Sequence, residues 1–140
     1  MKRLFIFSMI IFLSSCATSY HRKSFTGGYS EIRIREDVFK VSFKGNSRTS
    51  MERAVDFALL RSAVLTLRSG YKYFVITKGK HYVKEFYQVY YDGITANSQL
   101  VQKPRVYFDI QCYHSKPKGH SYNANYLAES IKEKYRLKNQ

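Results

Sequence analysis

Apolar and polar residues alternate along two neighbouring stretches, residues 31–35 (EIRIR) and 39–44 (FKVSFK). A period of two places alternate side chains on opposite faces of a half-buried strand. Gly45-Asn46 is a turn signal that closes the second stretch. The pattern therefore predicts two strands that form a hairpin, with their apolar residues on one shared face.

A helix is expected next, because the pattern changes to a spacing of three and four residues. Thr49 to Glu52 fits a capping box, in which Thr49 accepts from the first-turn amides and Glu52 reaches back. The helix should run to Ser69, before Gly70, which suits the left-handed position after a helix end. A second amphipathic helix is expected from Asn123 to about Leu137, with Asn123 as its N-cap.

Three further strands are expected between the helices. Residues 71–77 and 81–91 are rich in aromatic and β-branched types, and residues 105–113 alternate clearly. Residues 92–103 are polar, begin with Asp92-Gly93, and are expected to form a loop. The expected order is therefore ββαβββα.

These elements predict an α+β fold, with an antiparallel sheet of about five strands packed on one long helix and a C-terminal amphipathic helix. The apolar face of the sheet is expected to consist of Ile32, Ile34, Phe39, Val41, Phe43, Val106, Phe108 and Ile110. A chain of 140 residues has the length of one domain.

The first residues have the pattern of an export signal. Lys2 and Arg3 precede ten largely apolar residues, 4–13, which are too few to span a bilayer but suit a signal-peptide core. Residues 13–16 (Leu-Ser-Ser-Cys) resemble the lipobox of bacterial lipoproteins. An ordinary secretory signal that contains a cysteine is the alternative.

The lipobox resemblance implies cleavage before Cys16 and covalent lipid on that cysteine. The chain then divides into a signal peptide (1–15), a lipidated N-terminus and tether (16–27), and one α+β domain (28–140). Ala17 follows the cysteine in place of Asp, which by resemblance to the enterobacterial sorting rule implies the outer membrane, with the domain facing the periplasm. Membrane attachment through Cys16 is the one partner that this pattern predicts.

Four short segments, in this order, resemble a family of small uncharacterised proteobacterial lipoproteins. They are Gly28-Tyr29-Ser30, Phe43-Lys44-Gly45-Asn46, Leu59-Leu60-Arg61-Ser62-Ala63 and Gly70-Tyr71-Lys72-Tyr73-Phe74. The resemblance covers residues 28–76. It implies a lipidated envelope protein and brings no assigned activity, ligand or catalytic residue.

Cysteine content limits the chemistry that the chain can support. With Cys16 lipidated, Cys112 is the only free thiol, so a disulfide within the mature chain is excluded. Cys112 and His114 share a face of the expected strand, but a structural zinc site needs four ligands. The favoured interpretation is a core thiol, and no metal or other cofactor is predicted.

Positive charge is the remaining signal, with 24 Lys and Arg against 10 Asp and Glu and a net charge of +14. A candidate polyanion-binding face consists of Arg33, Arg35, Lys40, Lys44 and Arg105 on the outer side of the sheet. The alternative is that these side chains are merely solvated. Because an envelope location is expected, nucleic acid is not an expected partner.

No catalytic residue is predicted, because the sequence contains no G-x-S-x-G, H-E-x-x-H, P-loop or G-x-G-x-x-G motif. The leading hypothesis is a non-enzymatic envelope lipoprotein that binds a protein or a surface polymer. Two alternatives stay open: a small hydrolase or metal-dependent enzyme, and an electrostatic binder of anionic envelope polymers.

Overall fold

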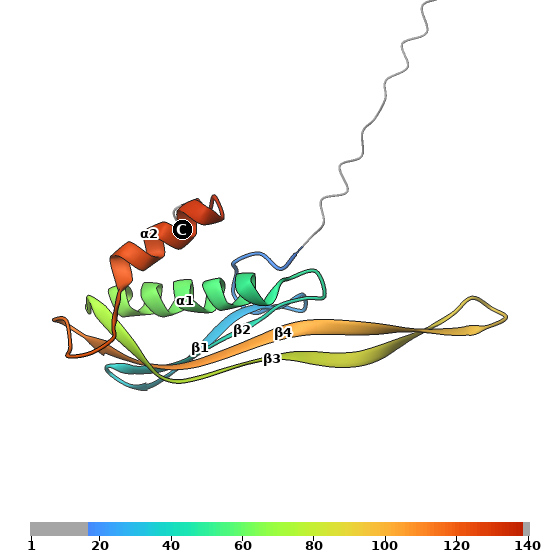
Figure 1. The fold of residues 1–140 in the computed structure, drawn as a ribbon, viewed down its shortest axis with the longest axis horizontal. Coiled ribbons are helices and arrows are strands. Elements are labelled where there is room, and N and C mark those ends of the chain that lie inside the picture. The colour runs from blue at the N-terminus through green and yellow to red at the C-terminus, as the bar shows by residue number, and fades with distance from the viewer. Residues whose placement is uncertain (1–16, 139–140) are drawn as a thin grey trace, which may run out of the picture.

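The computed structural model describes residues 17–138, so Cys16 and the expected signal peptide lie outside the described residues. The elements in chain order are β1 (Gly28–Arg35), β2 (Val38–Lys44), α1 (Met51–Arg68), β3 (Tyr73–Tyr91), β4 (Ala96–Tyr113), β5 (Tyr122–Asn123) and α2 (Ala124–Lys134). The five strands form one antiparallel sheet in the order β1-β2-β4-β3-β5 (Figure 1). The predicted α+β class, with a five-stranded antiparallel sheet and two helices, is confirmed.

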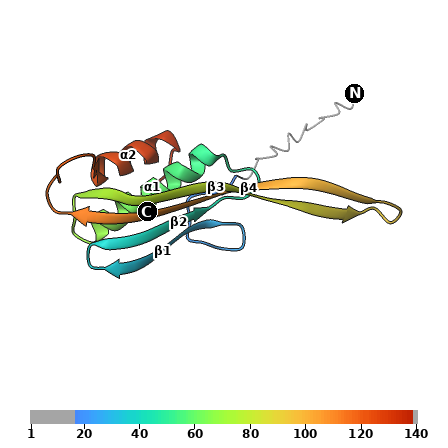
Figure 2. The ribbon, with the colours of Figure 1, turned by 60° about the horizontal axis from the view of Figure 1, so that its bottom comes forward.

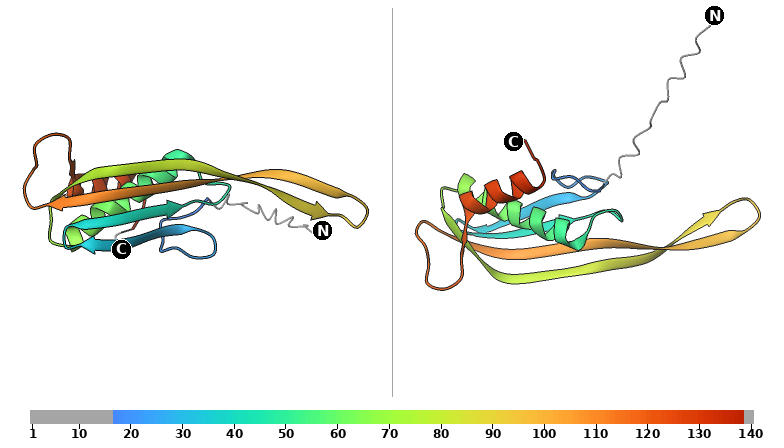
Figure 3. Two further views of the ribbon diagram at one scale, coloured as in Figure 1. Left: turned by 90° about the horizontal axis from the view of Figure 1, so that it is seen from below. Right: turned by 45° about the horizontal axis from the view of Figure 1, so that its top comes forward.

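The molecule has three layers, because α1 lies between the sheet and α2 (Figure 1). Helix α1 therefore meets protein on two sides, and even Ser62 and Thr66 within it are fully buried. Their hydroxyls donate to the carbonyl oxygens one turn earlier, so no buried hydroxyl lacks an acceptor there. Within residues 17–138, no helix covers the opposite face of the sheet, as the view from below shows (Figure 3).

The helix ends follow the expected chemistry with one change. The N-cap of α1 is Ser50, whose hydroxyl accepts from the backbone of Arg53 at 3.1 Å, so the cap predicted at Thr49 is wrong by one residue. Thr49 is buried instead, and its hydroxyl accepts from the backbone of Thr18. Gly70 takes a left-handed φ of +85° after α1, and Asn123 caps α2, both as predicted.

Strand β1 presents the face opposite to the predicted one. Ile32 and Ile34 are 63% and 51% exposed, so their assignment to the apolar face is wrong, whereas the six predicted residues of β2 and β4 are buried. Glu31 lies opposite Val41 in the ladder and therefore shares its helix-facing side. The reason is an ion pair with Arg61 of α1, described below.

The two longest strands differ from the expected layout. Residues 71–77 and 81–91 were expected as separate strands, but 73–91 form one strand with an irregularity between Ile76 and Lys78. Most of the loop expected at 92–103 is strand as well, since β4 begins at Ala96. As a result β3 and β4 form a long ribbon that extends far beyond the helices (Figure 2).

Residues 17–21 pack largely against the body, although a tether was expected for residues 16–27. Thr18 is 3% exposed, its backbone N–H donates to Thr49, and its hydroxyl accepts from the backbone of Asn46 at 2.7 Å. Tyr20 packs against Phe57 of α1, with ring centroids 5.6 Å apart. Such hydrogen bonds and aromatic contacts order a short polar segment that has no apolar period of its own.

Candidate functional site

The ribbon beyond the end of β2 forms what we call the arm, residues 83–104. Pairing of β2 with β4 ends at Lys44 and Arg105, while β3 and β4 remain paired without interruption from Val83–Pro104 to Tyr91–Ala96. Within the described part of the chain, no third strand pairs with β3 or β4 along the arm (Figure 1). A two-stranded ribbon is only marginally stable in water by itself, so the arm is a costly feature for a purely structural role.

The base of the arm is fixed by a close approach between Gly45 and Pro104. The backbone N–H of Gly45 donates to the carbonyl of Pro104 at 3.0 Å. A Cβ on Gly45 would lie 2.6 Å from Pro104 Cγ and 2.7 Å from Thr49 Cβ, which only glycine avoids. In a strand, the N–H and C=O of one residue point to the same side. The carbonyl of Pro104 points toward Gly45, so the N–H that proline lacks would also have pointed there. Its absence therefore removes no hydrogen bond between β3 and β4.

The surface of the arm is apolar and aromatic but exposed to solvent. The large exposed apolar side chains of the arm are Val83, Tyr87, Val89, Tyr90, Tyr91, Ile94 and Leu100, among which Tyr91 and Ile94 are 81% and 95% exposed. Residues 86–102 contain a single charged side chain, Asp92, although the whole chain has a net charge of +14. The outer arm is thus a tyrosine-rich, nearly uncharged surface on a strongly basic protein.

The turn at the tip of the arm is held by Asp92. Its carboxylate accepts from the backbones of Ile94 at 3.0 Å and Thr95 at 2.7 Å, and from the Thr95 hydroxyl at 2.8 Å. Gly93 takes a left-handed φ of +91°. The hydrogen bonds from Thr95 and Ile94 lower the pKa of Asp92 from 3.8 to about 2, because they stabilise the ionised carboxylate.

Four cations meet beside the base of the arm, in what we call the basic pocket: Lys23, Lys44, Lys103 and Arg105. They line a hollow of about 380 Å³ together with residues 24–27 and the turn at 45–46. Lys44 and Arg105 are direct neighbours on β2 and β4. Partial burial lowers the pKa of Lys44, and the nearby charges of Lys23, Arg105 and Lys84 lower it further.

No carboxylate compensates this charge within residues 17–138, where none of the ion pairs involves a side chain of the basic pocket. Arg105 donates only to backbone carbonyls, those of Gly45 and Pro104, each at 2.9 Å. Like charges held together without a counter-charge repel one another, so an anion bound among them would be stabilised.

The five residues predicted as a polyanion-binding face do not form one patch. Only Lys44 and Arg105 come together, in the basic pocket. Lys40 lies apart from them, opposite the acidic Asp109 in the ladder. Arg33 lies over the Phe39 ring on the helix-facing side, and Arg35 is 3.8 Å from Asp37.

Sequence reasoning missed Lys84 and Lys103, which lie opposite each other in the β3–β4 ladder. The signal was present in Asp92-Gly93, a dipeptide typical of hairpin turns. A hairpin centred there would have brought both lysines to the same end of the ribbon, but would not have given their register, because the loop has four residues and pairs Tyr91 with Ala96.

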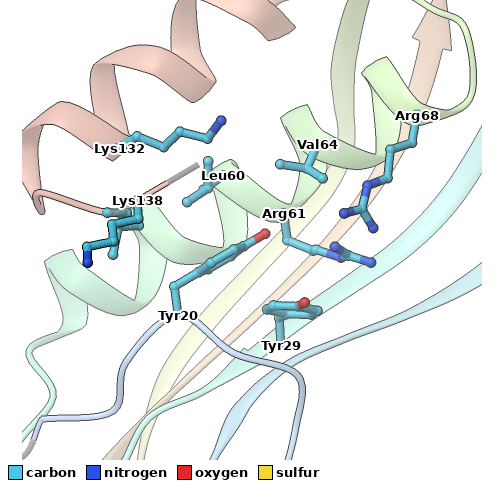
Figure 4. A pocket seen from close by; sticks show the side chains of 9 residues that line it. Tyr20, Tyr29, Leu60, Arg61, Val64, Arg68, Lys132 and Lys138 are labelled. Atoms are coloured by element: carbon cyan, nitrogen blue, oxygen red, sulfur yellow. The ribbon is translucent and has the colours of Figure 1, made fainter. Parts of the chain in front are cut away.

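A second enclosed site surrounds Arg61, whose side chain is 6% exposed (Figure 4). Arg61 binds Glu31 with two hydrogen bonds, Nε to Oε2 at 3.1 Å and Nη2 to Oε1 at 2.7 Å. Its guanidinium also lies 4.2 Å from the centre of the Tyr29 ring. Burial of Glu31 raises its pKa, but the hydrogen bonds and charge of Arg61, with those of Arg22, outweigh that effect and leave the pKa lowered.

The hollow next to Arg61 holds only about 60 Å³, and Arg61 already satisfies a carboxylate of the chain itself. The arrangement is an ion pair that connects α1 to β1, as is typical of a structural role. Glu31 supplies the carboxylate that a buried guanidinium needs. Asp56 instead accepts from the Tyr135 hydroxyl at 2.7 Å and joins α1 to the end of α2.

Cys112 lies in the core at 2% exposure, with its sulfur 3.4 Å from the Thr66 hydroxyl. Burial raises the pKa of the Cys112 thiol, and the hydrogen bond with Thr66 only partly offsets this effect. His114 stacks on Tyr71 instead of approaching the thiol, with ring centroids 4.4 Å apart. Among residues 17–138 no three His, Cys, Asp or Glu side chains are grouped as metal ligands would be.

Comparisons with protein-family models, curated proteins and solved structures found no match to this chain. Within the described residues, neither helix combines the length and the hydropathy needed to traverse a bilayer. Function is therefore argued from the arm and the basic pocket.

Proposed function

We propose that this protein is a lipid-anchored, non-enzymatic module of the bacterial envelope that binds another protein through its arm. The observation that carries the proposal is the exposed tyrosine-rich ribbon of residues 86–102, which stands clear of the body. Tyrosine is enriched at the centres of protein interfaces and Lys and Glu are depleted there. The outer arm has this composition.

Charge favours a protein over an anionic polymer as the ligand of the arm. A surface that binds polyanions carries Lys or Arg, because neutralising phosphates supplies most of the affinity. Residues 86–102 contain neither. Tyrosine rings offer large, rigid contact areas and a hydroxyl, which suit a mixed protein surface.

The free edges of the arm offer a second mode of contact. Each arm strand pairs on one side only within the described chain, so its other edge has backbone N–H and C=O groups open to hydrogen bonding. An extended segment of a partner could add to such an edge as a further strand.

The anchor in this proposal is lipid on Cys16, held in the outer membrane with the domain facing the periplasm. The basic signal start, its short apolar core and the lipobox-like residues 13–16 support it. Several acyl chains make such an anchor effectively permanent. In cells, Cys16→Ala should leave a longer precursor without lipid; normal acylation of that variant would contradict the anchor.

Photo-cross-linking in cells tests the arm. A photoreactive residue at Tyr87, which is 71% exposed on the arm, should capture one dominant protein. The matched control is the same residue at Tyr126, which is 75% exposed on α2 and should capture no such product. Equal capture from both positions, or none from Tyr87, would reject the arm as the binding surface.

A second experiment uses two exposed arm residues whose side chains the body does not bury. Tyr87→Ser with Tyr91→Ser should abolish capture by a probe at Val89 while leaving the unfolding midpoint of the protein unchanged. Retained capture would show that these rings do not contribute to binding.

A further inference from the structure

The exposure of Phe25 has no explanation in the packing of the fold. Phe25 lies at the tip of a tight loop, closed by hydrogen bonds between Ser24 and Gly27 of 2.7 Å and 3.2 Å, and it is fully exposed. Gly27 holds the loop against the body at a φ of +114°, where a Cβ would overlap the carbonyl oxygen of Lys44. The loop is therefore firmly placed, yet it presents a bare phenyl ring to the surroundings.

The ring lies at the rim of the basic pocket. Phe25 and the four cations Lys23, Lys44, Lys103 and Arg105 line the same hollow. An aromatic side chain surrounded by lysine and arginine suits the interface of an anionic bilayer, where the ring enters the headgroup and acyl boundary and the cations meet phosphates. No carboxylate of the described chain competes for these cations.

The position of Thr18 gives the third observation. The hydroxyl of Thr18 donates to the carbonyl of Thr26 at 3.3 Å, so the segment that follows Cys16 is fixed beside the Phe25 loop. Cys16 precedes Thr18 by two residues in the sequence, and two residues span at most about 7 Å. A lipid on Cys16 would enter the bilayer next to Phe25 and the basic pocket.

We propose that the Phe25 loop and the basic pocket together bind the phosphate headgroups of anionic phospholipids, in the leaflet that holds the Cys16 anchor. The inference rests on the proposed lipidation of Cys16 and adds to it a fixed orientation. Lipid chains alone leave a domain free to rotate about its anchor, whereas a second contact made by the folded domain fixes which side faces the bilayer.

Vesicle binding of the mature chain, residues 16–140, with Cys16→Ser separates this contact from the anchor. The unlipidated protein should bind vesicles of phosphatidylethanolamine and phosphatidylglycerol and not vesicles of phosphatidylcholine alone. Lys44→Ser with Lys103→Ser should weaken binding about 25-fold, since each cation near the surface contributes about fivefold. The control, Lys116→Ser with Lys118→Ser, removes the same charge from exposed residues outside the pocket and should leave binding nearly unchanged.

The absence of tryptophan from the sequence allows a direct measurement at the loop. Phe25→Trp should show a blue-shifted emission on adding phosphatidylglycerol vesicles, and brominated lipids should quench it. Tyr126→Trp on α2 should show neither effect. Phe25→Ser should weaken vesicle binding at least about tenfold, because a phenyl ring would no longer be buried.

Each other outcome would overturn the inference. Equal losses in the pocket and control variants would indicate a non-specific effect of net charge. If inorganic phosphate bound to the pocket and vesicles did not, the pocket would be a site for a free anion. If the protein preferred a soluble anionic polymer to vesicles, the pocket would be a polymer site. A Phe25→Trp emission that vesicles leave unchanged would exclude insertion of the loop.

The vesicle assay uses protein without lipid, so it does not depend on whether Cys16 is acylated in cells. If the purified protein failed to bind vesicles but Cys16 proved to be lipidated in cells, only this inference would fail. If the purified protein bound vesicles but Cys16 proved not to be lipidated in cells, the lipid anchor of the proposed function would be rejected instead.

Discussion

At the scale of single residues, the Glu31–Arg61 pair decides the orientation of β1. A guanidinium buried in α1 needs a carboxylate, because an uncompensated charge in a protein interior is strongly destabilising. Glu31 supplies it from the helix-facing side of β1, and Ile32 is turned outward as a consequence. An ion pair here outweighs the burial of two isoleucines.

Removing one member of the pair should destabilise the fold. Glu31→Gln leaves Arg61 buried without its counter-charge and should lower the free energy of unfolding by about 3–5 kcal/mol. Urea unfolding measures this change. Glu129→Gln, which breaks an exposed pair with Lys132, should change it by less than about 1 kcal/mol. Equal effects of the two substitutions would contradict the importance of the buried pair.

The same pair predicts a dependence of stability on acid. The pKa of Glu31 in the folded protein is below its ordinary value of 4.5, so the folded state favours the ionised form. Its contribution to stability is therefore complete above that ordinary pKa and is lost as the pH falls through the lower folded pKa. Urea unfolding at a series of pH values should show a smaller acid loss in Glu31→Gln than in the natural protein.

At the scale of elements, the arm depends on its turn because it has no core. Among residues 17–138, its regular stabilisation comes from the hydrogen bonds between β3 and β4, whose register the turn at Asp92 sets. The folded body, by contrast, is held by side chains packed between three layers.

Asp92→Ala should loosen the arm and leave the body intact, because it removes the acceptor for Ile94 and Thr95. Amide hydrogen exchange should become faster in residues 86–101 and stay unchanged in α1. In the natural protein the same loosening should occur only near pH 2, as the lowered pKa of Asp92 is reached. Uniform acceleration over the whole chain would show instead that the arm and the body unfold together.

The elements that the sequence predicts well are those with one buried and one solvated face. Residues 106–112 of β4 alternate clearly because every second side chain enters the core. Residues 96–100 belong to the same strand but are exposed on both faces, so no period marks them and the sequence predicts a loop there. Alternation of apolar and polar residues arises only where one face of a strand is buried. A strand that is exposed on both faces therefore has no such pattern in its sequence.

The candidate site was predictable only in part for a related reason. Lys44 and Arg105 could be placed on one face from alternation alone. Grouping them with Lys23 and Lys103 requires the strand register and the path of the segment before β1, both of which depend on long-range contacts. Phe25 carries no sequence signal at all, since a single aromatic residue in a polar segment is common.

At the scale of the whole molecule, we expect the arm to contribute little to the free energy of unfolding of the body. Replacing residues 86–101 by Asn-Gly joins Glu85 to Gln102, which already face each other with a side-chain hydrogen bond of 2.6 Å. This shortened protein should keep its free energy of unfolding within about 1 kcal/mol, because an isolated ribbon contributes little. Urea unfolding measures this, and a loss of several kcal/mol would show that the arm supports the fold.

Among the described residues no third strand lies beside the arm, and this has a consequence for how the protein can diversify. Substitutions in the body are constrained by packing, whereas most side chains of residues 86–102 are exposed and are constrained chiefly by what they bind. Selection can therefore change recognition without lowering the stability of the fold. In related chains we expect this ribbon to vary in step with its partner, and positions that covary between the two proteins to lie along it.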